Sequence, residues 1–479
     1  MSPDKLEVLA PSLLSTVPAD IWRAIFKLCA SRDTNPDPRY HLPSVTDRSP
    51  VLLCRVCSVW RTIATNAPEL WNTVHVFIDF VGNSSLTRKI LELFLERAGT
   101  LPLKITLDTS SPILSDAAEG VIDLLLHNFY RADYIAVEIN LLQDIIMRRW
   151  GPLQLDEILS EGLPSLQTLV LRASKKSKPD ACISKLWTLS PKLTKVVFHR
   201  SITFEWLHVV NTLQIPLAQL TALHILARIG VNDLHLLFSK FKNIVECTIG
   251  DLILTDGLIT HEIFLPNLRC LGLTAKWNII GFIRHLETPA LTVLDMQDSG
   301  EDWQPGVFTS FIAKSRCSLK HFGVTVLDTN EKEKLDCFYL FPDLTSLTVY
   351  KSDINLKDTG TGYDFHYYLI EELGKWDRSK REFSVLPHLQ QIEIDYEILG
   401  YGADTMLFAN MVEDRWIRTK VTNLPEDYTV DSDDASIFKW APNEILRLLI
   451  LKRDGLDVEL DPVPPIATEV FHLRRRLRG

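Results

Sequence analysis

The chain has 479 residues, 46% of them hydrophobic and 23% charged, with a net charge of −10. This hydrophobic content can fill a large core, and the negative charge argues against a surface for phosphate backbones, which needs clustered Lys and Arg. We therefore expect no nucleic-acid partner. Because no run approaches 18 apolar residues and no secretory leader pattern opens the sequence, we also expect no membrane span, and a cytoplasmic or nuclear location.

Residues 1–12 are expected to be disordered, and the first ordered part is predicted at 13–78. Pro18 opens a predicted helix, in which Ile21, Ile25 and Leu28 recur at helical spacing. Trp22 and Phe26 form a second apolar row on the same helix.

A second helix is predicted from Pro50, where Ser49 can cap the first turn. Its apolar positions are Leu52, Leu53, Val56, Val59, Trp60 and Ile63. Pro68 to Trp71 adds a short third turn that ends in a bulky side chain. Both helices are apolar over more than one face, and a unit of this size cannot bury two such faces within itself, so part of this surface is predicted to contact a partner.

The order of these residues resembles the F-box, in the form common in mushroom-type fungi. The matching segments are Val17-Pro18-Ala19-Asp20-Ile21, Ile25-Phe26, Ser49-Pro50-Val51-Leu52-Leu53, Val56-Cys57-Ser58-Val59-Trp60-Arg61, Ile63-Ala64 and Pro68-Glu69-Leu70-Trp71. Two features depart from the family pattern: Val17 stands where leucine is usual, and the loop from Ser31 to Arg48 is longer than usual. The alternative is that the apolar residues only form the core of an ordinary helical hairpin.

The resemblance implies that the F-box docks on a Skp-type adaptor, which links it to a cullin and to ubiquitin-conjugating enzymes. The family's docking surface corresponds here to Val17, Pro18, Ile21, Ile25, Leu53, Val56, Cys57 and Trp60.

Residues 79–150 are less regular and are predicted to form degenerate first repeats that cap the array that follows. Strands are expected at Leu101–Leu107 and at Tyr134–Ile139, with a helix from Asp116 to Phe129 between them. A cap is needed because a bare terminal repeat would expose its core.

Residues 151–400 contain a repeat. Nine segments fit the pattern L-x-x-L-x-L, with first positions at Leu166, Leu193, Leu220, Ile244, Leu268, Leu291, Leu319, Leu344 and Leu389. Their spacing of 23 to 28 residues, except for a last step of 45, is typical of leucine-rich repeats. We interpret Asp353 to Phe383, inside the long step, as an inserted loop.

Proline precedes many repeats, where it ends one helix and fixes the backbone before the next strand. Helices are expected at Leu234–Phe241, Ile279–Leu286 and Phe308–Ser315. The predicted fold class is therefore α/β: a small N-terminal three-helix F-box followed by a curved leucine-rich-repeat solenoid, with strands on the concave face and helices outside. An unrelated α/β sandwich with leucine-rich strands is the alternative.

Residues 401–479 are predicted to close the array. Helices are expected at Asp404–Lys420 and Asn443–Arg453, and a strand at Leu456–Leu460. The acidic stretch Pro425–Ser436 is interpreted as a solvated loop, and the basic end Arg474–Arg478 as a solvated tail, with an import signal or a site for an acidic partner as alternatives.

The outward residues of the predicted strands form a candidate target-binding surface, since side chains alternate between the two faces of a strand. The candidates are Arg172, Lys195, His199, Asp295, Tyr350, Glu393 and Asp395. Early strands carry cations and late strands carry anions, which favours a partner with the opposite gradient, although solvated strand faces also alternate charge by chance.

Signatures of catalysis are weak. Cys54-x-x-Cys57 lacks the two further ligands of a zinc site, and Asp358-Thr359-Gly360 occurs once, whereas aspartic proteases pair two such carboxylates. We predict no enzyme activity, no cofactor and no metal.

The sequence thus predicts the substrate-recognition subunit of an SCF-type ubiquitin ligase, which binds a Skp-type adaptor, through it a cullin, and a target protein of unknown identity. The alternatives are a non-degradative F-box/LRR scaffold and a small-ligand sensor with its site in the concavity of the solenoid.

Overall fold

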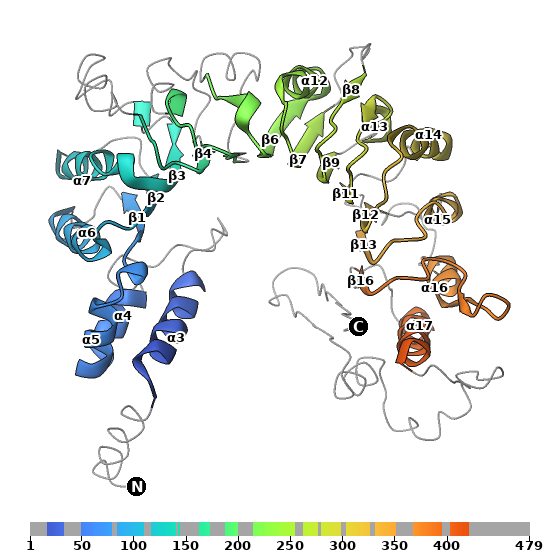
Figure 1. The fold of residues 1–479 in the computed structure, drawn as a ribbon, viewed down its shortest axis with the longest axis horizontal. Helices are drawn as coiled ribbons and strands as arrows, with labels where there is room; N and C mark the ends of the chain where they lie inside the picture. Colours follow the sequence, from blue (N-terminus) through green and yellow to red (C-terminus); the bar gives the residue numbers. More distant parts are fainter. Residues whose placement is uncertain are drawn as a thin grey trace, which may run out of the picture. The chain divides into compact units, whose positions relative to one another are not determined.

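The structure, a computed structural model, describes residues 17–32, 49–78, 84–109, 116–139, 142–143, 162–172, 187–199, 214–253, 262–275, 279–297, 303–325, 331–350, 367–394 and 403–420. The chain divides into two compact units, Met1–Leu220 and Thr221–Gly479. Figure 1 shows that each unit has parallel strands with helices along one side of them.

The first unit begins with helices that pack on one another. They are α3 (Ala19–Arg32), α4 (Ser49–Val56), α5 (Ser58–Thr65) and the 3₁₀ turn η2 (Pro68–Leu70). The prediction of one continuous helix after Pro50 is wrong, because the helix is interrupted at Cys57. The backbone of Cys57 is extended, with φ −158° and ψ 171°, and its Sγ accepts a hydrogen bond from the N–H of Trp60 at 3.4 Å, so Cys57 caps α5.

Aromatic side chains form the core of this helical part. Phe26 is fully buried, and its ring centroid lies 4.9 Å from that of Trp60, which lies 5.0 Å from that of Trp22. The indole of Trp71 is buried and donates its Nε1–H to the carbonyl of Ala64 at 2.7 Å. The predicted turn at Pro68–Trp71 is confirmed, and it fixes the end of the helical part.

The sheet of the first unit is parallel, in the order β1 (Thr73–Ile78), β2 (Leu103–Thr109), β3 (Ala132–Glu138), β4 (Thr168–Arg172) and β5 (Lys195–Phe198). Its helices are α6 (Ser84–Ala98), α7 (Asp116–Leu126) and the 3₁₀ turns η3 (Phe129–Arg131) and η5 (Leu217–Gln219). Both strands predicted in 79–150 are confirmed to within a few residues, and β1 places residues 73–78 in this sheet.

The second unit has a parallel sheet in the order β6 (Ala222–Gly230), β7 (Glu246–Ile253), β9 (Cys270–Ala275), β11 (Val293–Gln297), β12 (His321–Thr325), β13 (Ser346–Tyr350) and β16 (Gln391–Ile394). Its helices are α12 (Val231–Lys240), α13 (Ile279–Ile283), α14 (Pro305–Ser315), α15 (Glu331–Phe338), α16 (Tyr367–Gly374) and α17 (Ala403–Lys420). Two short strands, β8 (Ile263–Phe264) and β10 (Leu286–Glu287), pair separately.

The predicted repeat positions coincide with the core. In every predicted repeat the first apolar residue is buried and the second and third lie on a strand. Register pairs align equivalent positions, as in Leu271 with Leu294, Leu294 with Phe322 and Phe322 with Leu347. Stacking equivalent apolar residues buries a continuous core between neighbouring repeats. The fold is therefore mixed α/β with a largely parallel sheet, as expected.

The interpretation of Asp353–Phe383 as a loop is wrong for its second half. Helix α16 buries Leu369, Ile370 and Leu373. An antiparallel hairpin of β14 (Trp376–Asp377) and β15 (Glu382–Phe383) follows it. The polar first half of the segment hid these elements from the sequence pattern.

Helix α17 closes the described part of the second unit. The guanidinium of Arg415 is buried and donates to the carbonyls of Leu373, Val385 and Leu386 at 2.7, 2.6 and 3.0 Å, and it stacks on the ring of Phe383 at 4.2 Å. One side chain thus ties α17 to α16 and to the segment after the hairpin.

Several predicted features lie outside the described residues: the N-terminal segment 1–12, the acidic stretch 425–436, the last helix 443–453, the strand 456–460 and the tail 474–478. Within the described residues, no helix is long and apolar enough to cross a membrane.

Candidate functional site

An apolar stripe lies on the surface of α3. Ile21, Ile25 and Leu28 are spaced i, i+4 and i+7, so they lie on one face of the helix. Their exposed fractions are 52%, 40% and 69%. The aromatic row of the same helix faces inward instead, because Phe26 is fully buried.

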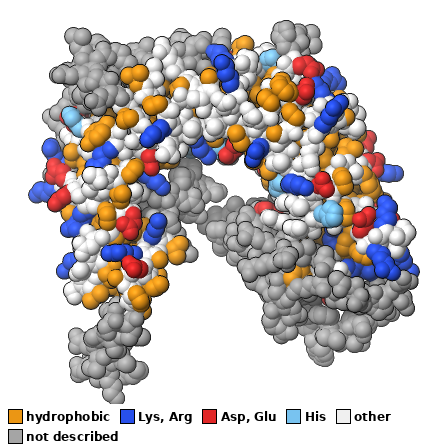
Figure 2. All heavy atoms as spheres, viewed as in Figure 1, with side chains coloured by type: hydrophobic (Ala, Val, Ile, Leu, Met, Phe, Trp, Pro, Cys, Tyr) orange, Lys and Arg blue, Asp and Glu red, His pale blue; other side chains and the backbone are white. Residues whose placement is uncertain are grey.

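A second apolar stripe lies on α4 and α5. Leu52, Val56 and Val59 are 43%, 60% and 42% exposed. Figure 2 shows hydrophobic side chains on the surface of the region that α3, α4 and α5 form. We call these six side chains the docking stripes. Exposed apolar side chains gathered on one surface are typical of sites that bind a protein, a membrane or a ligand.

The predicted docking residues divide into two groups. Pro18, Ile21, Ile25 and Val56 are exposed, and Val17 and Cys57 are half-buried, so a partner can reach them. Two others belong mainly to the core: Leu53 is 8% exposed, and the ring of Trp60 packs against Trp22 and Phe26.

The prediction omitted Leu28, Leu52 and Val59, which the structure exposes. The helical spacing of Leu28 after Ile21 and Ile25 was the signal that could have included it. For the second stripe, the pattern did not distinguish Leu52 from its neighbour Leu53, because both positions are apolar.

Local sequence explains how α3 and α4 begin. The carbonyl of Pro18 accepts hydrogen bonds from the N–H groups of Ile21 and Trp22 at 3.1 and 3.3 Å, which starts α3 one residue after the proline. Pro50 lies in the first turn of α4, where its missing N–H is not needed. The two stripes are thus carried by regular helices around a packed aromatic core.

The outward strand face of the first unit carries an ion-pair network. Asp108 on β2 accepts from Nε2 of His75 on β1 at 2.9 Å and forms an ion pair with Arg172 on β4. Burial alone would raise the pKa of Asp108, but the hydrogen bond from His75 and the charge of Arg172 outweigh it and lower the pKa. Arg172, a predicted target-binding residue, is therefore engaged within the unit.

The corresponding face of the second unit carries a different cluster. The hydroxyl of Tyr350 on β13 donates to Oδ2 of Asp295 on β11 at 2.8 Å, and Nδ1 of His321 on β12 lies 2.9 Å from Oγ of Ser346. Burial raises the pKa of Asp295, and the hydrogen bond from Tyr350 opposes this only in part. Burial also lowers the pKa of His321, which favours its neutral form.

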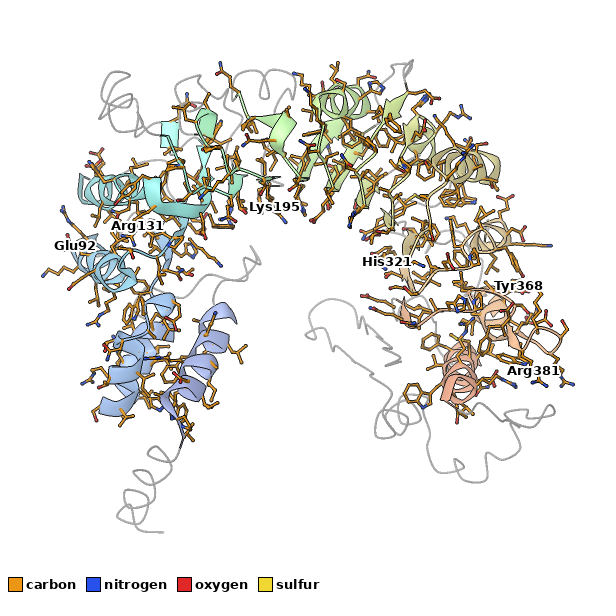
Figure 3. All side chains as sticks on the ribbon, viewed as in Figure 1. Glu92, Arg131, Lys195, His321, Tyr368 and Arg381 are labelled. Atoms are coloured by element: carbon orange, nitrogen blue, oxygen red, sulfur yellow. The ribbon has the colours of Figure 1, made fainter. Side chains whose placement is uncertain are left out.

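The other predicted residues of the strand faces occupy the expected positions. Lys195 begins β5, His199 follows β5, and Glu393 lies on β16, all three half-buried. Figure 3 shows Lys195 and His321 on the strand side of their units, and Glu92 and Tyr368 on the helix side. Asp395 lies outside the described residues.

A cavity of about 430 Å³ lies between α16, the hairpin and α17. Its lining includes Ile370, Trp376, Met411 and the ion pair of Arg418 with Asp414. This cavity is away from the strand face, where the sequence placed a possible ligand site. Among the described residues, no group of three or more His, Cys, Asp or Glu side chains is placed to hold a metal ion.

No protein-family model matches the chain, and no curated protein matches it. Among solved structures, a chain of the structure described as "Crystal structure of Rad7 and Elc1 complex in yeast" aligns with 74% of this chain and 95% of its own length, at 13% identity and a TM-score of 0.30.

Proposed function

We propose that the protein is the substrate-recognition subunit of an SCF-type ubiquitin ligase. In this role α3, α4 and α5 form an F-box that docks on a Skp-type adaptor, and the repeats form a leucine-rich-repeat solenoid whose strand face binds the target. The observation that carries the proposal is the pair of docking stripes, which coincides with the segment that resembles the F-box.

The exposed apolar area of the docking stripes favours complex formation. Six large apolar side chains exposed on one small helical part are costly to leave in water, and burying each such side chain stabilises a complex by up to about 1.5–3 kcal/mol. The aromatic core of Phe26, Trp22 and Trp60 holds the helices together, so the docking stripes are available without unfolding.

In this proposed role the protein has no catalytic chemistry of its own and acts in the cytoplasm or the nucleus. Its contribution is proximity: it holds a target lysine near a ubiquitin-charged enzyme, which raises the effective concentration of the reacting groups. The adaptor would connect it to a cullin.

The test is co-expression of the full chain with a Skp-type adaptor, followed by size-exclusion chromatography. We expect a stoichiometric complex for the wild type and loss of that complex for Ile25→Asp and for Val56→Asp, since each puts a charge into an apolar interface. Lys27→Asp is the matched control, because Lys27 is an exposed residue of α3 off the stripe. A wild type that elutes without adaptor would refute the docking role.

Cullin co-purification separates the proposed function from the scaffold alternative. Under the proposed function the complex with the adaptor also retains a cullin. A stable adaptor complex that never retains a cullin would support a non-degradative scaffold instead.

A further inference from the structure

The cavity of about 430 Å³ between α16, the hairpin and α17 lies at the end of the second unit, and we call it the end groove. Part of its lining is apolar, with Ile370, Leu407, Met411 and the ring of Trp376. A lining of this kind can bury the apolar side chains of a segment that lies along it.

The acidic side chains that line the end groove have cationic partners in the same lining. Asp414 pairs with Arg418 at 2.8 Å, and the carboxylate of Glu371 lies 3.8 Å from Nζ of Lys375. Each pair joins one negative and one positive charge, so the two pairs together leave no net charge. The remaining charged residue of the lining is Arg378, which makes the end groove positive.

The tip of the hairpin adds positive charge beside Arg378. Arg378 and Lys380 are exposed, and neither side chain forms an ion pair among the described residues. The carboxylate of Asp377 serves the turn instead, because it accepts hydrogen bonds from the N–H and hydroxyl of Ser379 at 2.8 and 2.6 Å and from the N–H of Lys380 at 3.2 Å. Figure 2 shows Lys and Arg side chains close together on the surface around α16 and the hairpin.

The sequence that follows α17 has the complementary charge. Helix α17 ends at Lys420, and the acidic stretch Pro425–Ser436 begins five residues later. This stretch contains no Lys or Arg, and its five carboxylates are Glu426, Asp427, Asp431, Asp433 and Asp434. Its large apolar side chains are Tyr428 and Val430, which point to the same side of an extended chain because they are two positions apart.

The acidic stretch is close enough to reach the end groove. Arg418 lines the groove two residues before α17 ends, and its guanidinium lies over the ring of Trp376, 4.8 Å from the ring centroid. The hairpin is therefore beside the end of α17 from which the chain continues. The eight residues from Lys420 to Tyr428 reach at most about 29 Å. The part of α17 that lines the groove, Leu407 to Arg418, is only about 16 Å long.

We propose that the end groove binds the acidic stretch Pro425–Ser436 of the same chain. Tyr428 and Val430 pack on the apolar part of the lining, and the carboxylates that follow them lie over Arg378 and Lys380. The short tether gives the stretch an effective concentration in the millimolar range, so an acidic segment of another protein must displace it to enter the groove. This contact lies within the second unit and does not depend on the docking role of α3, α4 and α5.

The test is limited digestion of the full chain with chymotrypsin, in which mass spectrometry follows cleavage after Tyr428. Because the docked stretch hides this bond, we expect Arg378→Glu/Lys380→Glu to raise its cleavage rate at least fivefold. Lys242→Glu/Lys332→Glu is the matched control, since both are exposed residues of the second unit and the double change shifts the net charge equally. We expect less than a twofold effect for the control.

Reversing the charges on both sides should restore protection of the bond. We expect Asp431→Lys/Asp433→Lys alone to be cleaved faster than wild type, and its combination with Arg378→Glu/Lys380→Glu to be cleaved within twofold of the wild-type rate. Equal cleavage rates in wild type and in the variant of the hairpin tip would overturn the proposal. Protection that grows with protein concentration would also overturn it, because the stretch would then bind a second copy. Unchanged circular dichroism spectra confirm that the variants are folded.

Discussion

Replacing Arg415 by methionine should destabilise the C-terminal end of the second unit. The substitution removes three hydrogen bonds to the carbonyls of Leu373, Val385 and Leu386, and leaves these buried acceptors without their donor. At about 1 kcal/mol for each hydrogen bond, the free energy of unfolding falls by about 3 kcal/mol. For a unit of this size, that loss lowers the melting temperature by about 6 to 12 °C.

The assay is thermal unfolding followed by circular dichroism, with limited proteolysis to locate the change at α17. Arg378→Met is the matched control, because Arg378 is an exposed residue of the hairpin and its loss should cost less than about 0.5 kcal/mol. If both variants melted at the same temperature, the assignment of Arg415 as the tie between α17, α16 and the segment after the hairpin would be refuted.

Three further predictions concern the helical part and the strand faces. Because the folded-state pKa of Asp108 is lowered, its pairing stabilises the fold above the unfolded pKa, and this stabilisation is lost as pH falls through the lowered pKa. Asp108→Asn should therefore reduce the melting temperature at pH 7 and have little effect on it at pH 2. A larger effect at pH 2 than at pH 7 would contradict the pairing. Trp60→Ala should lower the free energy of unfolding by about 3–5 kcal/mol and expose the helical part to proteases, because the ring of Trp60 packs on Trp22 and Phe26. A variant that stays resistant to proteases would indicate that Trp60 is a surface residue. Gly323→Ala should lower the melting temperature, because a Cβ at this position would lie 2.5 Å from Oδ1 of Asp295 and 3.0 Å from the ring of Tyr350 and would displace one of these side chains. An unchanged melting temperature would contradict the close packing of Asp295 and Tyr350 over Gly323.

The strands were predictable because each repeat carries its own apolar triplet. Burial of Leu271, Leu294 and Leu347 follows directly from a pattern written within six residues of sequence. The break at Cys57 was not predictable in the same way, because the apolar positions continue at helical spacing on both sides of it and only the cap geometry shows that the helix is interrupted.

The candidate sites were predictable in part. A helix that is apolar on more than one face does not reveal which face is the core, so Leu53 and Trp60 were assigned to the surface although they pack inward. The network of Asp108 joins residues 33 and 64 positions apart in the chain, and no local pattern connects them. Only the stacking of the strands brings these side chains together.

Binding of a Skp-type adaptor by the docking stripes can be measured by isothermal titration of purified adaptor into the full chain. We predict micromolar or tighter binding for the wild type, and a loss of at least 100-fold, about 2.7 kcal/mol, for Ile25→Asp/Val56→Asp. Lys27→Asp should bind as the wild type does. Absence of binding by the folded wild type, or equal losses in the stripe variant and the control, would contradict the account.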